Sequence, residues 1–116
     1  TAYQVYDVLH AMEKDSGIVL PAMRCDGGAV VNNFLMQFQA DILNIPVLIP
    51  EITEATALGS AFMASIGAGF VSSTEELQSH WKLACSFEPK MSNDERMHLL
   101  SQWHRAVERA RNWSED

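Results

Sequence analysis

Cysteine is scarce in this chain: its 116 residues include only Cys25 and Cys85. Two thiols that lie far apart in the sequence make neither a disulfide framework nor a zinc-ligand motif, which favours a reducing cytoplasm as the location. Long apolar runs are missing as well. No stretch approaches the roughly 20 residues that a membrane span needs, and no secretory signal opens the chain, so we expect no membrane partner.

Basic residues are also few. Eight Lys and Arg stand against fifteen Asp and Glu, which gives a formal net charge of -7. Nucleic acids and anionic membranes bind basic surfaces, so the charge disfavours both as partners. The four histidines show no metal-ligand spacing, and we expect no metal site made by the protein alone.

What remains is the composition of one small globular domain, with 47% hydrophobic and 20% charged residues. The first residues predict a helix, because Val5, Val8, Leu9 and Met12 have helical spacing. Thr1 is the expected N-cap, and Gly17 suits the left-handed position after the helix. Because natural chains rarely begin at the first turn of a helix, we expect a domain cut from a longer protein.

Two short apolar runs, residues 22–25 and 45–50, predict strands, and Pro46 and Pro50 bound the second run. Residues 29–43, between the two runs, have a helical period. We expect one continuous helix there, with one apolar face made by Val31, Phe34, Leu35, Phe38 and Ile42.

A helix rich in small residues is expected over residues 53–70, with Thr53 as its cap and with Leu58, Ala61, Phe62, Ser65 and Ile66 at helical spacing. A short helix over 74–81 and a loop over 85–91 follow. The last helix begins at the capping box of Ser92 and Glu95, and its predicted buried stripe is Leu100, Trp103, Val107 and Ala110.

Strands separated by helices predict an α/β fold with a parallel sheet, because the return path between parallel strands needs a crossover. Two short strands are too little sheet to stand alone. We therefore expect the missing strands upstream of Thr1.

The run Asp26-Gly27-Gly28 joins the first strand to the helix after it. A hairpin would need alternating residues on both sides, and the residues that follow have a helical period instead. The turn is then either a plain strand-to-helix connection or a phosphate site, since glycines let a ligand approach the backbone and a helix start offers free N–H groups. Asn32 and Asn33, expected one turn into the helix, could reach a base or a ribose.

The stretches "RCDGGAVVNNFLMQFQADILNIPV" and "EATALGSAFMASIGAGF" resemble the carboxyl-terminal domain of glycerol kinases, a group within the FGGY carbohydrate kinases of the hexokinase–actin superfamily. The tail "WHRAVERARNW" is similar to their last helix. The resemblance implies a ribonuclease H-like ATPase domain with short parallel strands flanked by helices. Residues 1–116 would be part of the carboxyl-terminal domain, on the nucleotide-binding side of the cleft.

The resemblance also implies site residues. Gly28 would offer backbone to the phosphates of ATP or ADP, Gly27 would share this close approach, and Asn32 would line the adenosine pocket. Asp26 would order the turn or its water. The helix over residues 55–68 would pack closely behind the loop. Cys25, where a branched apolar residue is common, and Ala55 before Thr56 depart from the family pattern.

By resemblance, the full enzyme transfers the γ-phosphoryl group of ATP to glycerol to give glycerol 3-phosphate, with Mg²⁺ bound mainly through the phosphates, and it is a homo-oligomer. No catalytic residue is expected in these 116 residues, so the rest of the kinase polypeptide is a required partner and the isolated chain is expected to be inactive. A xylulose or gluconate kinase of the same family, or an α/β interaction module without a nucleotide site, remain alternatives.

Overall fold

The computed structural model describes residues 1–75 and 81–111. The elements follow one another in a mixed α/β order: α1 (Ala2–Ser16), β1 (Met23–Arg24), the 3₁₀ helix η1 (Gly28–Val31), α2 (Asn33–Leu43), β2 (Val47–Pro50), α3 (Ala55–Gly67), β3 (Leu83–Phe87) and α5 (Asn93–Ala110). The predicted α/β class and both predicted strands are therefore confirmed. In the described ranges, no helix is long and apolar enough to cross a membrane.

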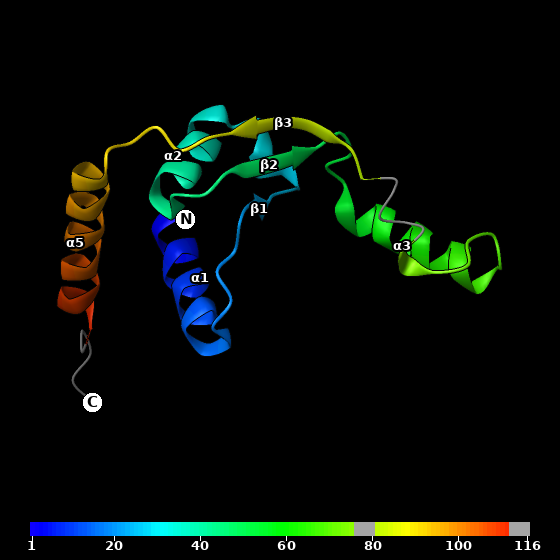
Figure 1. The fold of residues 1–116 in the computed structure, drawn as a ribbon, viewed down its shortest axis with the longest axis horizontal. Coiled ribbons are helices and arrows are strands. Elements are labelled where there is room, and N and C mark those ends of the chain that lie inside the picture. Colours follow the sequence, from blue (N-terminus) through cyan, green and yellow to red (C-terminus); the bar gives the residue numbers. More distant parts are fainter. Residues whose placement is uncertain (76–80, 112–116) are drawn as a thin grey trace.

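The strands form one small sheet in the order β1-β2-β3 (Figure 1). β1 pairs with β2 in parallel, as predicted, and β3 pairs with β2 in the antiparallel direction. The predicted loop over residues 85–91 was wrong at its start, because residues 85–87 belong to β3. Four of the five β3 side chains are exposed, so this strand has no alternating apolar pattern to reveal it. Backbone pairing with β2 holds it in the sheet.

The core lies between α2 and the sheet. Val30, Met36, Ala40, Val47 and Ile49 form one buried cluster. Met23, Cys25, Leu35 and Phe87 pack against that cluster from its edges. Cys25 is half-buried there, and its thiol serves as a small apolar group.

α3 extends away from the sheet, at the end of the molecule opposite α5 (Figure 1). It has no buried residue, and even its large apolar side chains are only half-buried, as Phe62 is, or exposed, as Met63 is. The radius of gyration is 18.0 Å, whereas a compact chain of this length would have roughly 13 Å. The prediction that this helix packs closely behind the glycine loop was wrong.

The two long terminal helices begin and end near the predicted caps, although Thr1, at the N-cap position of α1, makes no side-chain capping bond. Gly17 ends α1 with φ 70°, and the Ser92 side chain accepts a hydrogen bond from the Glu95 N–H at 3.2 Å. Thr53, in contrast, does not cap α3, whose N-cap position is Glu54 without a side-chain bond.

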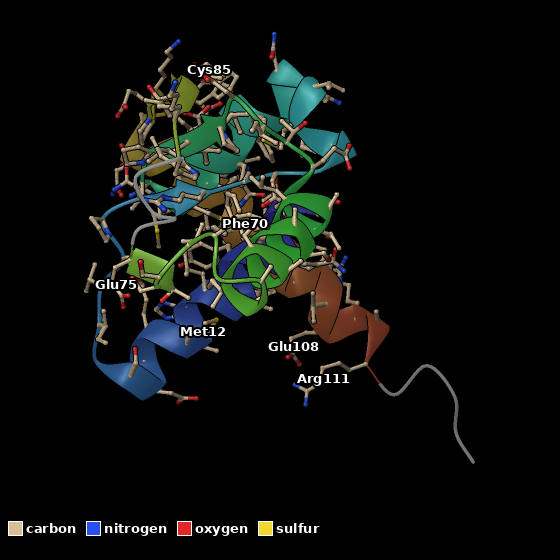
Figure 2. All side chains as sticks on the ribbon, turned by 90° about the vertical axis from the view of Figure 1, so that its right-hand side faces the viewer. Met12, Phe70, Glu75, Cys85, Glu108 and Arg111 are labelled. Atoms are coloured by element: carbon tan, nitrogen blue, oxygen red, sulfur yellow. The ribbon has the colours of Figure 1, made fainter. Side chains whose placement is uncertain are left out.

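The apolar stripes of these helices are only partly covered. In α5, Leu100 is buried, Trp103 and Val107 are half-buried, and Ala110 is exposed. In α1, Val8 and Met12 are exposed; Figure 2 shows Met12 on the outside of the helix. A periodic stripe identifies the apolar face, but the chain does not supply enough neighbours to bury it. Of the predicted short helix over 74–81, Thr74 and Glu75 are helical, while residues 76–80 lie outside the described ranges.

An aromatic chain joins α2, α1 and α5. Phe34 stacks on Phe38, the Phe38 ring meets the Tyr3 ring edge-on at 5.6 Å, and Tyr3 stacks on Trp103 at 5.4 Å. Asp7 of α1 binds Trp103 and His104 of α5 through its two carboxylate oxygens. These side-chain contacts hold α5 beside α1.

Candidate functional site

The glycine loop continues from the carboxyl end of β1. The Cys25 N–H donates to the Leu48 carbonyl at 3.0 Å and so extends the pairing with β2. Gly27 then has φ 83° and ψ -179°, a conformation that essentially only glycine adopts. Its N–H donates to the Thr53 carbonyl at 2.8 Å, which ties the loop to the segment after β2.

Gly28 begins the 3₁₀ helix and is exposed. Within the part of the chain that the structure describes, the N–H groups of Gly28 and Ala29 have no hydrogen-bond acceptor, while the next N–H, that of Val30, donates to the Gly27 carbonyl. A Cβ atom built on Gly28 would meet nothing within 4 Å. Two free donors beside open space can receive an anion.

Asn32 is the N-cap of α2. Its Oδ1 accepts a hydrogen bond from the Leu35 N–H at 3.1 Å, and its side chain is exposed. The predicted single helix over residues 29–43 is therefore two helices: the 3₁₀ turn ends at Val31, and α2 begins at Asn33. Asn32 and Asn33 lie at the start of α2 and not one turn inside it. Asx side chains favour such caps because they replace a missing backbone acceptor.

The capping bond fixes what Asn32 can offer to a ligand. Oδ1 is committed to Leu35, and the Nδ2 group has no acceptor among residues 1–75 and 81–111. The Asn32 amide therefore has two free N–H donors, whereas its oxygen already accepts one hydrogen bond.

Two apolar side chains flank Asn32 and are unusually open. Val31 is 83% exposed and Phe34 is 79% exposed. Both were predicted to lie on one apolar helical face with Leu35, Phe38 and Ile42, but Val31 belongs to the separate 3₁₀ turn. The 3₁₀ turn has about three residues per turn, so it shifts Val31 out of phase with α2. Phe34 keeps its helical spacing to Phe38 and Ile42 within α2, and it is open because it lies at the exposed start of that helix. Sequence reasoning did not single out these two residues as open side chains beside Asn32.

Asp26 makes no side-chain hydrogen bond within the described residues, and the bond from Gly27 to Thr53 holds the turn instead. Asp26 affects its neighbour through charge. Partial burial, together with the Asp26 carboxylate, raises the pKa of the Cys25 thiol above its ordinary value. The thiol is therefore protonated at neutral pH and is a poor nucleophile.

Two cavities in the surface lie away from the glycine loop. One of about 590 Å³ lies between α1 and α5 and is lined by Tyr6, Leu100 and His104, among others. The other, of about 300 Å³, lies between the end of β2 and α3 and is lined by Ile52, Phe62 and Trp81, among others. Neither is lined by the glycine loop or Asn32. Gly28, Ala29 and Asn32 are exposed, so the candidate site is an open surface. No group of three His, Cys, Asp or Glu side chains in the described ranges could hold a metal ion.

Comparison with known proteins gives a consistent result. Residues 1–68 match the FGGY family of carbohydrate kinases, C-terminal domain. The glycerol kinase of Petrotoga mobilis is 56% identical over 115 residues, which is 99% of this chain and 23% of the relative. The chain therefore spans about a quarter of the length of the curated relatives that it matches.

Solved structures agree with the sequence matches. The structure of Plasmodium falciparum glycerol kinase with ADP has a TM-score of 0.80 at 31% identity and covers 97% of this chain and 23% of that one. A ligand-bound xylulose kinase from Lactobacillus acidophilus has the same TM-score and coverage at 17% identity, which shows the fold alone. The extended position of α3 is thus compatible with the fold of full-length kinases.

Proposed function

The chain belongs to the FGGY family of carbohydrate kinases, and we propose that it forms the carboxyl-terminal, nucleotide-holding wall of an ATP-dependent glycerol kinase. The full enzyme transfers the γ-phosphoryl group of ATP to a terminal hydroxyl of glycerol and yields glycerol 3-phosphate. The names of relatives that are 51–56% identical favour glycerol over xylulose or gluconate as the acceptor. Residues 1–116 are one part of the carboxyl-terminal domain.

One observation carries this proposal: the free N–H groups of Gly28 and Ala29 lie beside open space at the carboxyl end of β1. Ligands of open α/β sheets bind at the carboxyl ends of the strands, and backbone donors suit phosphate oxygens. Gly28 and Ala29 bind the nucleotide phosphates. Gly27 holds the turn in a conformation that no other residue adopts without strain.

Asn32 binds the nucleoside through its Nδ2 donors, because its Oδ1 is occupied by the Leu35 N–H. Ring nitrogens of a purine and oxygens of a ribose are acceptors, so they are the complementary atoms. The similar glycerol kinase of Plasmodium falciparum was solved with ADP, which supports a nucleotide as the ligand.

The remaining parts of the active site come from the rest of the polypeptide. Phosphoryl transfer depends on positioning and charge stabilisation from both sides of the cleft. The polyol site and the base that accepts the hydroxyl proton lie outside these 116 residues. Mg²⁺ enters with the nucleotide, held mainly by phosphate oxygens and water, and supplies neutralisation of the phosphate charge. As further parts of the proposal, the full enzyme is cytoplasmic, which the two free thiols support, and homo-oligomeric.

Calorimetric titration of the full-length kinase with ADP tests the proposal. A Gly28→Val variant places a side chain in the space that the phosphates would fill, and we expect ADP affinity to fall at least tenfold while the enzyme stays folded. Gly67→Val, at another exposed helical glycine with nothing within 4 Å, is the matched control and should bind ADP normally. Unchanged affinity in Gly28→Val would favour an interaction module without a nucleotide site.

A further inference from the structure

The outer face of the Phe34 ring is an open aromatic surface beside the candidate nucleotide site. Its inner face stacks on Phe38 with ring centroids 6.1 Å apart and an interplanar angle of 6°. The side chain is nevertheless 79% exposed. A phenyl ring that is packed on one side and bare on the other offers a flat apolar surface for a second planar group.

The inner face of the Phe34 ring is supported by the aromatic chain of Phe38, Tyr3 and Trp103. Phe38 contacts Tyr3 edge-on, Tyr3 stacks on Trp103, and the Trp103 indole N–H donates to Asp7 at 2.7 Å. The chain fixes Phe38, and Phe38 in turn limits the orientations of Phe34. A ring that is already oriented loses little further freedom when a ligand stacks on it.

Phe34 also follows the proposed nucleotide contacts in order along the chain. Three steps of a 3₁₀ helix, at about 2 Å each, separate Gly28 from Val31. Asn32 follows with its outward donors, and Phe34 is two residues further. The order along the chain is therefore phosphate donors, amide donor, aromatic ring, which matches the order of phosphate, sugar and base in a nucleotide.

We propose that Phe34 is the platform on which the nucleobase stacks, with Val31 as the apolar edge on the other side of Asn32; this inference rests on the proposed kinase function. Stacking does not distinguish one purine from another. Asn32 has two free Nδ2 donors, while its Oδ1 already accepts from the Leu35 N–H, so the expected contacts are with the acceptor nitrogens of a purine ring.

The test uses the full-length kinase and three variants. Phe34→Leu keeps an apolar side chain but removes the ring, and we expect the Kd for ADP and the KM for ATP to rise about tenfold, as for the loss of one base–aromatic stack. The KM for glycerol should not change. Phe34→Tyr keeps the ring and should bind ADP like the parent enzyme.

Phe70→Leu is the matched control, because Phe70 is 84% exposed and lies just beyond α3 (Figure 2). It should leave ADP affinity unchanged. Unchanged ADP affinity in Phe34→Leu overturns the inference. An equal loss of ADP affinity in Phe34→Tyr and Phe34→Leu, together with a lower Tm, overturns it as well, because it would indicate that Phe34 contacts another part of the protein. If Gly28→Val weakens ADP binding and Phe34→Leu does not, only this inference fails. If neither does, the proposed function fails as well.

Discussion

The indole Nε1 of Trp103 donates a 2.7 Å hydrogen bond to Oδ2 of Asp7, and this bond joins α5 to α1 across 96 positions of sequence. The other carboxylate oxygen of Asp7 lies 2.9 Å from Nε2 of His104. One side chain of α1 therefore holds two consecutive side chains of α5. The attachment of the last helix depends on the charge state of this carboxylate.

Acid should loosen that attachment. Burial acts to raise the pKa of Asp7, but the hydrogen bonds from Trp103 and His104 and the charges of His104 and His10 outweigh it, so the pKa lies below 3.8. A depressed folded-state pKa gives stability that is present above the unfolded value and is lost as pH falls through the folded value. We expect hydrogen-exchange protection of α5 amides in the full-length kinase to fall as the pH is lowered below about 4.

Asp7→Asn is the control for this pH dependence. It should reduce α5 protection at neutral pH by less than about 1 kcal/mol, because Asp7 is partly exposed and its ion pair is screened by solvent. Below the pKa of the carboxyl group, the variant and the parent enzyme should converge. If the α5 amides of Asp7→Asn and of the parent enzyme had equal protection factors at neutral pH, the Asp7 carboxylate would not hold α5.

Asp41 performs a similar task deeper in the molecule. This buried carboxylate accepts the Lys90 and Met91 N–H groups and the Gln37 amide, and so fixes the segment before α5 on α2. Asp41→Ala leaves the Lys90 and Met91 N–H groups without an acceptor, while the Gln37 amide keeps its bond to the Glu88 carbonyl. We expect a loss of roughly 2–4 kcal/mol in the free energy of unfolding. Asp15→Ala, which changes an exposed carboxylate, should cost less than about 0.5 kcal/mol in the same denaturant titration. Equal stability of the two variants would contradict this role.

Local signals in the sequence predicted much of this fold. The cap at Ser92, the left-handed Gly17 and the proline-bounded β2 each depend on neighbouring residues, and all three are confirmed. β3 was missed because its pairing is with β2, far away in the sequence, and its side chains are exposed. A strand held by backbone bonds alone leaves no hydrophobic pattern.

The glycine run was correctly predicted to join the first strand to a helical segment, but the start of the helix was predicted wrongly. The sequence of residues 29–43 has a continuous apolar period, whereas the chain makes a 3₁₀ turn, stops at Asn32 and starts α2. The capping preference of Asn competes with helix continuation, and the cap wins here. The interruption separates Val31 from the apolar face of α2, and periodicity alone could not reveal this.

The two loop glycines should respond differently to the same substitution. Gly27→Ala puts a side chain on a residue with φ 83°, and we expect a loss of about 1–3 kcal/mol in stability although nothing lies within 4 Å of the new Cβ. Gly28→Ala, one residue later in an ordinary conformation, should change stability by less than about 0.5 kcal/mol. Thermal unfolding of the two full-length variants tests this, and equal Tm values would show that the Gly27 conformation is not required.

Catalysis should need the rest of the polypeptide. In the proposed function, the described residues provide donors for the nucleotide from one side of the cleft only, whereas phosphoryl transfer requires stabilisation from both sides. We expect the purified 116-residue chain, shown by circular dichroism to be folded, to produce no ADP from ATP when glycerol is added. The full-length kinase, assayed in parallel, should do so. Glycerol-dependent ATP turnover by the short chain would refute the assignment of the catalytic groups to other regions.

Asn32 allows the capping role to be separated from the binding role. Asn32→Asp keeps an oxygen that can accept from the Leu35 N–H, so α2 should remain capped and Tm should stay close to that of the parent enzyme. The same change removes both Nδ2 donors and adds a negative charge next to the nucleotide. We expect the Kd for ADP to rise at least tenfold, about 1.4 kcal/mol. Asn32→Ala loses the cap as well, so it should lower stability by about 1 kcal/mol in addition to weakening ADP binding. If Asn32→Asp bound ADP as tightly as the parent enzyme, Asn32 would be a helix cap and nothing more.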